Sequence, residues 1–396
     1  MFRNKTSYSD IGKILFIFIC LLYGWVPFEA GSYDASFKIH LIFMLLLMIY
    51  AFYSNSFKLS KYGMLFFIFF IFLSSILFFV SYGRAIYSFI PAIAFASIVV
   101  PSIYNNTQFK YQFTQALFVL IVISIIMVFF QVIVYFTTGD LLLLHEFVFP
   151  FSKARIATEL QFNNLTRMGG MYIEPGTYSN YMFILLTIYM VLKKRINYLL
   201  LFFSAISIII TNSVWGMVFG SYLIIIIFFM KLVQTSWVNR IILLFFIFVF
   251  SFYSIGSLEK SFKNNTAVEY AIVKLERNGG KESTAPKKRA YIKYAQTFDQ
   301  FLILGEGFAP KFKKGIDALQ DAGLLLNFSV VFGIICTIVF LLIYFVLLVK
   351  LTNYVILLIS LPIFMSKLFY WDPSIWLLFF MLIYEYSLLK RGKKTK

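Results

Sequence analysis

Continuous runs of apolar residues dominate this chain, and most are close to the roughly 20 residues that a helix needs to cross a bilayer. The runs cover residues 11–29, 38–54, 62–80, 84–103, 112–136, 175–192, 197–211, 213–230, 240–256, 321–349, 353–370 and 373–389. The sequence therefore predicts an all-α polytopic membrane protein of about 12 transmembrane helices, with residues 1–396 forming a single membrane domain.

The first run follows Arg3, Lys5 and Lys13, as the apolar part of a signal peptide would. It is too long for that part, however, and no A-x-A cleavage motif follows it. We therefore expect an uncleaved first helix.

The composition excludes two broad classes of protein. Hydrophobic residues make up 61% of the chain and charged residues only 13%, against about 25% charged in soluble domains. The 51 Phe and 26 Tyr residues are incompatible with intrinsic disorder, which needs few aromatic side chains. A water-soluble domain and a disordered chain are both ruled out.

The distribution of charge predicts the orientation. With the N-terminus in the cytoplasm, the inner segments hold 17 of the 35 Lys and Arg residues, as the positive-inside rule requires. Only two acidic residues, Asp10 and Glu385, fall on the inner side, and the other 15 fall outside. Both termini are therefore expected in the cytoplasm. The net charge of +18 then reflects topology and an anionic inner leaflet, and not nucleic-acid binding.

Metal-binding and disulfide patterns are missing from the sequence. Cys20 and Cys336 both lie inside apolar runs, and His40 and His145 are far apart with no H-x-x-H spacing. We therefore expect neither a structural disulfide nor a transition-metal centre.

Two outer segments, 137–174 and 257–320, are too long to be simple connections between helices. Long ordered loops in compact proteins usually serve a function. Candidate chemistry is therefore sought in these two loops and at the helix ends beside them.

The first loop ends in a dense set of special residues. Arg167 and Glu174 lie seven residues apart at the predicted membrane edge, Gly169 and Gly170 permit a tight backbone, and Pro175 suits the first position of a helix. One interpretation is a capped helix with a surface ion pair. The other is that Arg167 and Glu174 line a cavity, as charged residues at membrane depth often do.

The second loop is basic, with 12 Lys or Arg residues and seven Asp or Glu residues. An outer loop gains nothing in topology from this excess, so it favours an anionic ligand such as pyrophosphate over the alternative of a solvated loop. Residues 287–301 are predicted to form an amphipathic helix with Arg289, Lys293 and Gln296 on one face. Gly305 and Gly307 do not indicate a nucleotide fold, because the motif is incomplete.

Weaker candidates lie at other helix ends. Asp321 is either a helix cap or a residue pointing into the same outer cavity as Glu174. Arg84 lies at the outer end of the fourth run. Asp372 and the following proline are interpreted as a turn, and Trp25, Trp371 and Trp376 as an interfacial aromatic belt.

These motifs resemble the bacterial O-antigen polymerases, a family related to the O-antigen ligases. The stretch Arg167-Met-Gly-Gly-Met-Tyr-Ile-Glu174-Pro-Gly is similar to the Arg-x-Gly-Gly-x-x-x-Glu-Pro stretch of that family. Arg289 with its aromatic helix and Leu304-Gly-Glu-Gly-Phe308 is the second similarity, and Asp321-Ala-Gly before a span containing Phe332-Gly333 is the third. The layout of about 12 spans with two large periplasmic loops matches along the whole chain.

The resemblance implies a GT-C-like membrane glycosyltransferase of the bacterial inner membrane, without metal or cofactor. It would polymerise undecaprenyl-pyrophosphate-linked O-antigen or capsule repeats at the periplasmic face, with a chain-length regulator and a flippase as possible partners besides membrane lipid. Arg167 and Arg289 would hold the donor pyrophosphate, Glu174 would be the base or position the acceptor, and Asp321 stands where the ligases tend to have His. The residues expected to bind substrate are Arg84, Arg155, Gly170, Tyr178, Lys288, Lys293, Gly305 and Gly307.

Three alternatives stay open at this point. A lipid-linked oligosaccharide flippase would also have 12 spans, but its cavity charges and repeated halves are not evident here. A ligase that transfers the polymer to lipid A-core is the second. A purely structural membrane protein is the third, and it would leave the outer Arg and Glu clusters unexplained.

Overall fold

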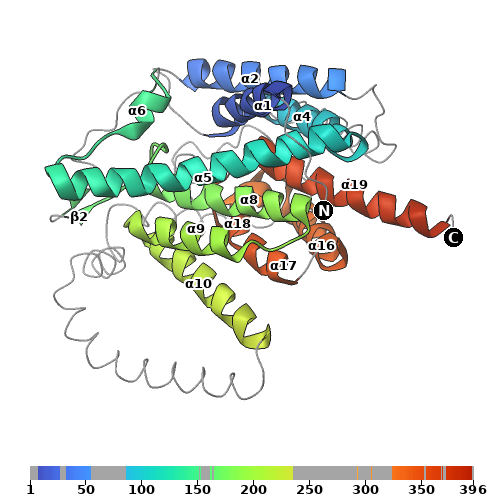
Figure 1. Cartoon of the computed structure of the whole chain (residues 1–396). Coiled ribbons are helices and arrows are strands. Elements are labelled where there is room, and N and C mark those ends of the chain that lie inside the picture. Colours follow the sequence, from blue (N-terminus) through green and yellow to red (C-terminus); the bar gives the residue numbers. More distant parts are fainter. Residues whose placement is uncertain are drawn as a thin grey trace.

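The computed structural model of the chain is mostly helical (Figure 1). It describes residues 8–26, 33–54, 86–150, 152, 161–162, 165–234, 292, 305, 323–351, 354–366, 368 and 372–394. The predicted spans 62–80 and 240–256 lie outside the described residues, and so does almost all of the second long loop. The number of spans therefore stays a prediction.

The described residues of the N-terminal part of the bundle form four helices, α1 (Tyr8–Trp25), α2 (Tyr33–Ser54), α4 (Ile86–Asn105) and α5 (Thr107–Thr138). Figure 1 shows α1, α2 and α4 in blue tones beside the long α5. Helix α1 packs against α2 and α5, and α4 also packs against α2 and α5. The apolar runs 11–29, 38–54, 84–103 and 112–136 are confirmed as helices in the residues that the structure describes.

The ends of α5 follow from local chemistry. The Asn106 side-chain oxygen accepts hydrogen bonds from the N–H groups of Gln108 and Phe109, at 2.9 and 3.0 Å. This cap begins the helix five residues before the apolar run at 112. At the other end Gly139 has φ +79°, a left-handed conformation that glycine adopts without steric cost.

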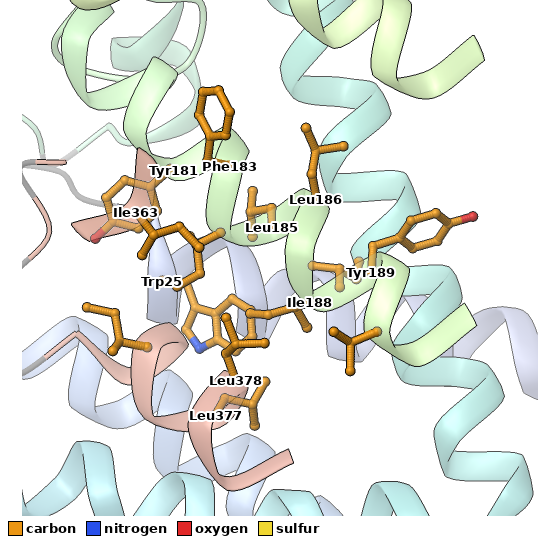
Figure 2. Close-up of a cluster of buried hydrophobic side chains, with 14 of the residues drawn as sticks. Trp25, Tyr181, Phe183, Leu185, Leu186, Ile188, Tyr189, Ile363, Leu377 and Leu378 are labelled. Carbon is orange, nitrogen blue, oxygen red and sulfur yellow. The ribbon is translucent and has the colours of Figure 1, made fainter. Parts of the chain in front are cut away.

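Helix α8 (Pro175–Lys193) occupies the centre of the bundle. Every residue from Pro175 to Leu192 is buried except Thr177. Helices α5, α9 (Tyr198–Ile210), α10 (Val214–Gln234), α17 (Tyr354–Ser360) and α19 (Pro373–Lys394) all pack against it. A helix that is buried all round forms the core of the fold, and Figure 2 shows its side chains meeting Trp25, Ile363 and Leu377.

Helices α9 and α10 cross closely because α10 has glycines one turn apart. A Cβ added at Gly216 would lie 2.5 Å from the Ile208 carbonyl oxygen, and one at Gly220 would lie 2.4 Å from Ile209 Cγ1. Small residues at such spacing let two helix backbones approach within a membrane.

The predicted span 321–349 is not one continuous helix. The chain forms two helices here, α15 (Leu324–Phe332) and α16 (Ile334–Leu351), which are separated at Gly333 with φ +83°. The predicted span 353–370 is likewise divided into α17 and the short α18 (Pro362–Met365), which begins at a proline. Broken helices at membrane depth occur where protein covers the freed backbone or where they line a cavity.

The predicted aromatic belt is also wrong for the two tryptophans that the structure describes. Trp25 is 2% exposed and Trp376 is fully buried. The Trp376 ring lies against Phe89, Phe328 and Phe340, with centroid distances of 5.3, 5.8 and 6.0 Å. These rings fill the core between α4, α15, α16 and α19 and do not mark an interface.

Two of the described helices, Thr107–Thr138 and Ile334–Leu351, are long and apolar enough to cross a membrane. Helix α16 also exposes an apolar stripe made of Ile335, Ile338, Leu342, Val346 and Val349. A continuous apolar stripe of this kind is unfavourable in water and is typical of a surface that contacts lipid or another protein.

Candidate functional site

The segment 165–174, which carries Arg167 and Glu174, is fastened to the bundle by three hydrogen bonds to its backbone. The Met168 N–H donates to Thr211 O at 3.2 Å, and the Asn212 side-chain amide donates to Thr166 O at 3.0 Å. The Gly170 N–H donates to the Gln131 side-chain oxygen at 2.9 Å. The segment is therefore held between α5 and the α9–α10 turn.

The segment begins with an antiparallel ladder two residues long, in which Leu165–Thr166 (β2) pairs with Gln161–Phe162 (β1). The ladder sets the direction in which the chain enters the segment.

The two glycines of the segment are required by packing. Gly170 has φ +60°, and a Cβ there would lie 2.9 Å from Val128 Cγ2 of α5. A Cβ at Gly169 would lie 2.5 Å from the carbonyl oxygen of Tyr172. These contacts give Gly170 a structural role, while the substrate contact expected from the sequence stays a prediction.

Arg167 is partly exposed at this end of the bundle. Its Nε atom is buried and has no hydrogen-bond partner within the described part of the chain. Buried polar atoms are nearly always paired in native proteins, so this N–H is available to a water molecule or a ligand. A guanidinium group in this position can form bidentate hydrogen bonds with phosphate oxygens.

Glu174 is the residue before α8, with extended backbone angles of φ −130° and ψ 138°. Its carbonyl oxygen accepts the Tyr178 N–H at 3.1 Å, but its side chain makes no capping hydrogen bond. Glu174 therefore does not cap α8 through its side chain. The carboxylate lies, half-buried, beside the positive end of α8.

Three tyrosines form a buried layer, in which Tyr172 belongs to the segment and Tyr178 and Tyr181 belong to α8. The Tyr172 ring lies 5.4 Å from that of Tyr178 and 6.0 Å from that of Tyr181, measured between centroids. The Tyr178 and Ser207 hydroxyls are 2.6 Å apart. Burial raises the pKa of the Tyr172 phenol. Tyr178 is fully buried among these groups. Burial in the core is a structural role, and the expected role of Tyr178 in substrate binding stays a prediction.

Asp372 joins this layer from the far end of the sequence. The Tyr181 hydroxyl donates to one Asp372 carboxylate oxygen, and the N–H and hydroxyl of Ser374 donate to the other. Asp372 is 3% exposed, and burial raises the pKa of its carboxyl group although these hydrogen bonds oppose the shift. The turn interpretation missed this residue, yet Asp before Pro and Ser is a recognisable start of a helix.

The structure brings together four of the residues predicted for the site, namely Arg167, Gly170, Glu174 and Tyr178. Seven others lie outside the described residues: Arg84, Arg155, Lys288, Arg289, Lys293, Gly307 and Asp321.

Gly305 is described, and it lies against the break between α15 and α16. A Cβ on it would be 2.6 Å from each of three backbone atoms, Gly333 N, Val330 O and Val331 O. The contact explains why glycine occupies this position, with φ +66°. Gly305 itself is thereby packed against the broken helix.

A separate polar cluster lies at the opposite end of α8 and α19. Lys194 forms an ion pair with the buried Glu385, whose other oxygen accepts the Tyr104 hydroxyl at 3.1 Å. The Tyr384 hydroxyl donates to the Asn105 side chain at 2.8 Å. Lys194 and Glu385 both lie at the end of α8 and α19 away from Arg167, and Glu385 is one of the two acidic residues expected on the inner side.

Among the described residues there is no group of three or more His, Cys, Asp or Glu side chains that could hold a metal ion. Comparison of the chain with protein-family models, curated proteins and solved structures gives no match.

Proposed function

We propose that this chain is a metal-independent glycosyltransferase of the bacterial inner membrane that polymerises undecaprenyl-pyrophosphate-linked oligosaccharide repeats at the periplasmic face. The observation that carries the proposal is the fastened 165–174 segment. It presents an arginine with an unsatisfied Nε and a carboxylate at one end of an apolar helix bundle.

The residues fit the chemistry of the transfer. A hydroxyl of the incoming repeat attacks the anomeric carbon of the growing chain, and the bond from that carbon to the pyrophosphate oxygen breaks. Negative charge develops on the leaving pyrophosphate, where Arg167 would stabilise it. Glu174 would accept the proton of the attacking hydroxyl as general base. Arg289 and Asp321 complete the proposed set by resemblance.

The apolar surface of the bundle suits a lipid-linked substrate. The exposed stripe on α16 is compatible with lipid around the protein. A polyprenyl tail of the donor would then stay in the bilayer while its pyrophosphate reaches Arg167. This arrangement would explain why a sugar-transferring enzyme is built almost entirely from apolar helices.

The lipopolysaccharide ladder of a deletion strain tests the proposal. We expect a single repeat on the lipid A-core, and restoration of the long ladder by the wild-type chain. Core without repeats, together with accumulated lipid-linked polymer, would instead identify a ligase. Lipid-linked repeats trapped on the cytoplasmic side would identify a flippase.

We also expect residues 150 and 285 to be periplasmic and residues 193 and 395 to be cytoplasmic. Single cysteines at these positions, in a variant with Cys20 and Cys336 replaced by serine, would be labelled with a membrane-impermeant thiol reagent. Lys193 is preferred to Lys194 because Lys194 pairs with Glu385. Labelling of position 193 in intact cells would overturn the proposed orientation.

A further inference from the structure

The hydrogen bond between Tyr181 and Asp372 joins two residues that are 191 positions apart in the sequence. Tyr181 belongs to α8, and Asp372 immediately precedes α19 and binds its first turn through Ser374. On its other side the Tyr181 ring contacts Tyr172, two residues before Glu174. A continuous series of contacts therefore runs from the start of α19 to the candidate site.

Neither stability nor helix capping by itself requires this link. A hydrogen-bonded pair can often be replaced by apolar groups of the same shape without loss of stability. A serine would cap α19 as well as an aspartate does. A fully buried carboxylate bonded to a tyrosine instead favours one geometry strongly, because any other arrangement leaves the charge unpaired.

The Arg167–Glu174 segment is held from two sides. Gln131 and Thr211 bind its backbone at Gly170 and Met168, and the tyrosine layer supports it at Tyr172. The hydrogen bonds with Gln131 and Thr211 fix the half of the segment that carries Arg167. The tyrosine layer lies beside the half of the segment that carries Glu174.

We propose that Tyr181 and Asp372 are positioning residues, which act through Tyr172 to hold Glu174 and Arg167 in the geometry needed for transfer. This inference rests on the proposed function. Neither residue touches the reacting atoms. Their effect arises because a displacement of about 1 Å in a positioned group lowers a rate by about a hundredfold.

Two substitutions test this role, with turnover expressed per amount of folded protein in the membrane, because Tyr181→Phe also leaves a buried carboxylate oxygen of Asp372 without that partner. Tyr181→Phe removes the hydroxyl and leaves the cap of α19 intact. Asp372→Ser keeps a capping oxygen for Ser374 and is too short to reach Tyr181. In membranes given lipid-linked repeats, we expect turnover to fall about tenfold to a hundredfold in each variant, the equivalent of one hydrogen bond to a charged group.

Two further measurements are specific to positioning. The repeat concentration for half-maximal rate should change by less than about twofold, because ground-state binding is retained. The double variant should be no slower than either single variant, because both remove the same link.

Tyr384→Phe is the matched control, since it removes a tyrosine hydrogen bond that α19 makes with α4 at the opposite end. It should keep wild-type turnover. The inference is overturned if Tyr181→Phe is fully active, if the double variant shows the product of the two single effects, or if turnover falls only in proportion to folded protein in the membrane. If wild-type membranes do not polymerise the repeats at all, it is the proposed function that fails.

Discussion

Replacement of Arg167 by alanine is expected to slow polymerisation at least a hundredfold, with a normal amount of protein in the membrane. Loss of a single donor that stabilises a developing anion costs about 2.7–4 kcal/mol of barrier. The side chain is partly exposed and its Nε has no partner among the described residues, so its removal breaks no bond of the fold described here. The long lipopolysaccharide ladder should collapse to a single repeat.

Arg167→Lys should restore little activity, because a single ammonium group cannot reproduce the planar fork that binds phosphate oxygens. Arg195→Ala serves as the control, since Arg195 is exposed beside Lys194 at the other end of α8. A full ladder in Arg167→Ala would show that the site is wrong. Disappearance of the variant from the membrane would show that Arg167 is structural. By resemblance, Arg289→Ala is expected to behave like Arg167→Ala.

Gly305→Ala is expected to have the largest effect on stability. The new methyl group would lie 2.6 Å from three backbone atoms of the α15–α16 break, and φ +66° is unfavourable for alanine. A left-handed alanine costs about 1–2 kcal/mol and overpacking about 1–3 kcal/mol, so the loss should be roughly 2–5 kcal/mol. The unfolding midpoint of the purified protein in detergent measures this loss.

Gly139→Ala isolates the conformational part of that cost. Gly139 has φ +79°, but a Cβ there would meet no atom within 4 Å. Its substitution should therefore cost only about 1–2 kcal/mol. Equal effects in the two variants would contradict the packing of Gly305 against the broken helix. Loss of activity with unchanged stability in Gly305→Ala would instead favour the substrate-binding role expected from the sequence.

Much of the helical architecture could be predicted from the sequence, because it depends on local properties. Apolar runs predicted the helices that became α1, α2, α4, α5, α8, α9, α10 and α19. Pro175 predicted the start of α8, since its fixed φ suits the first turn. The spacing of Arg167, the two glycines and Glu174 indicated one compact segment, and the structure describes it as such.

The helix break at Gly333 could not be predicted in this way. The apolar character of the sequence continues across Gly333, from residues 324–332 into residues 334–349, and hydropathy responds only to side-chain polarity. The break is set by backbone conformation at Gly333 and by the close approach of Gly305, which is 28 residues earlier in the chain. A contact between residues so far apart in the chain leaves no periodic pattern in the sequence around either residue.

The sequence by itself determined the apolar helices named above and the position of Arg167 and Glu174 relative to the start of α8. These follow from solvation and local sterics, which act within one or two turns. The tertiary structure alone decided that Asp372 is buried beside Tyr181 and that Trp376 belongs to the core. It also decided that Gln131 holds Gly170. The physical reason is that burial and pairing depend on which distant segments pack together, and in a chain with apolar residues on almost every face many packings satisfy the same local pattern.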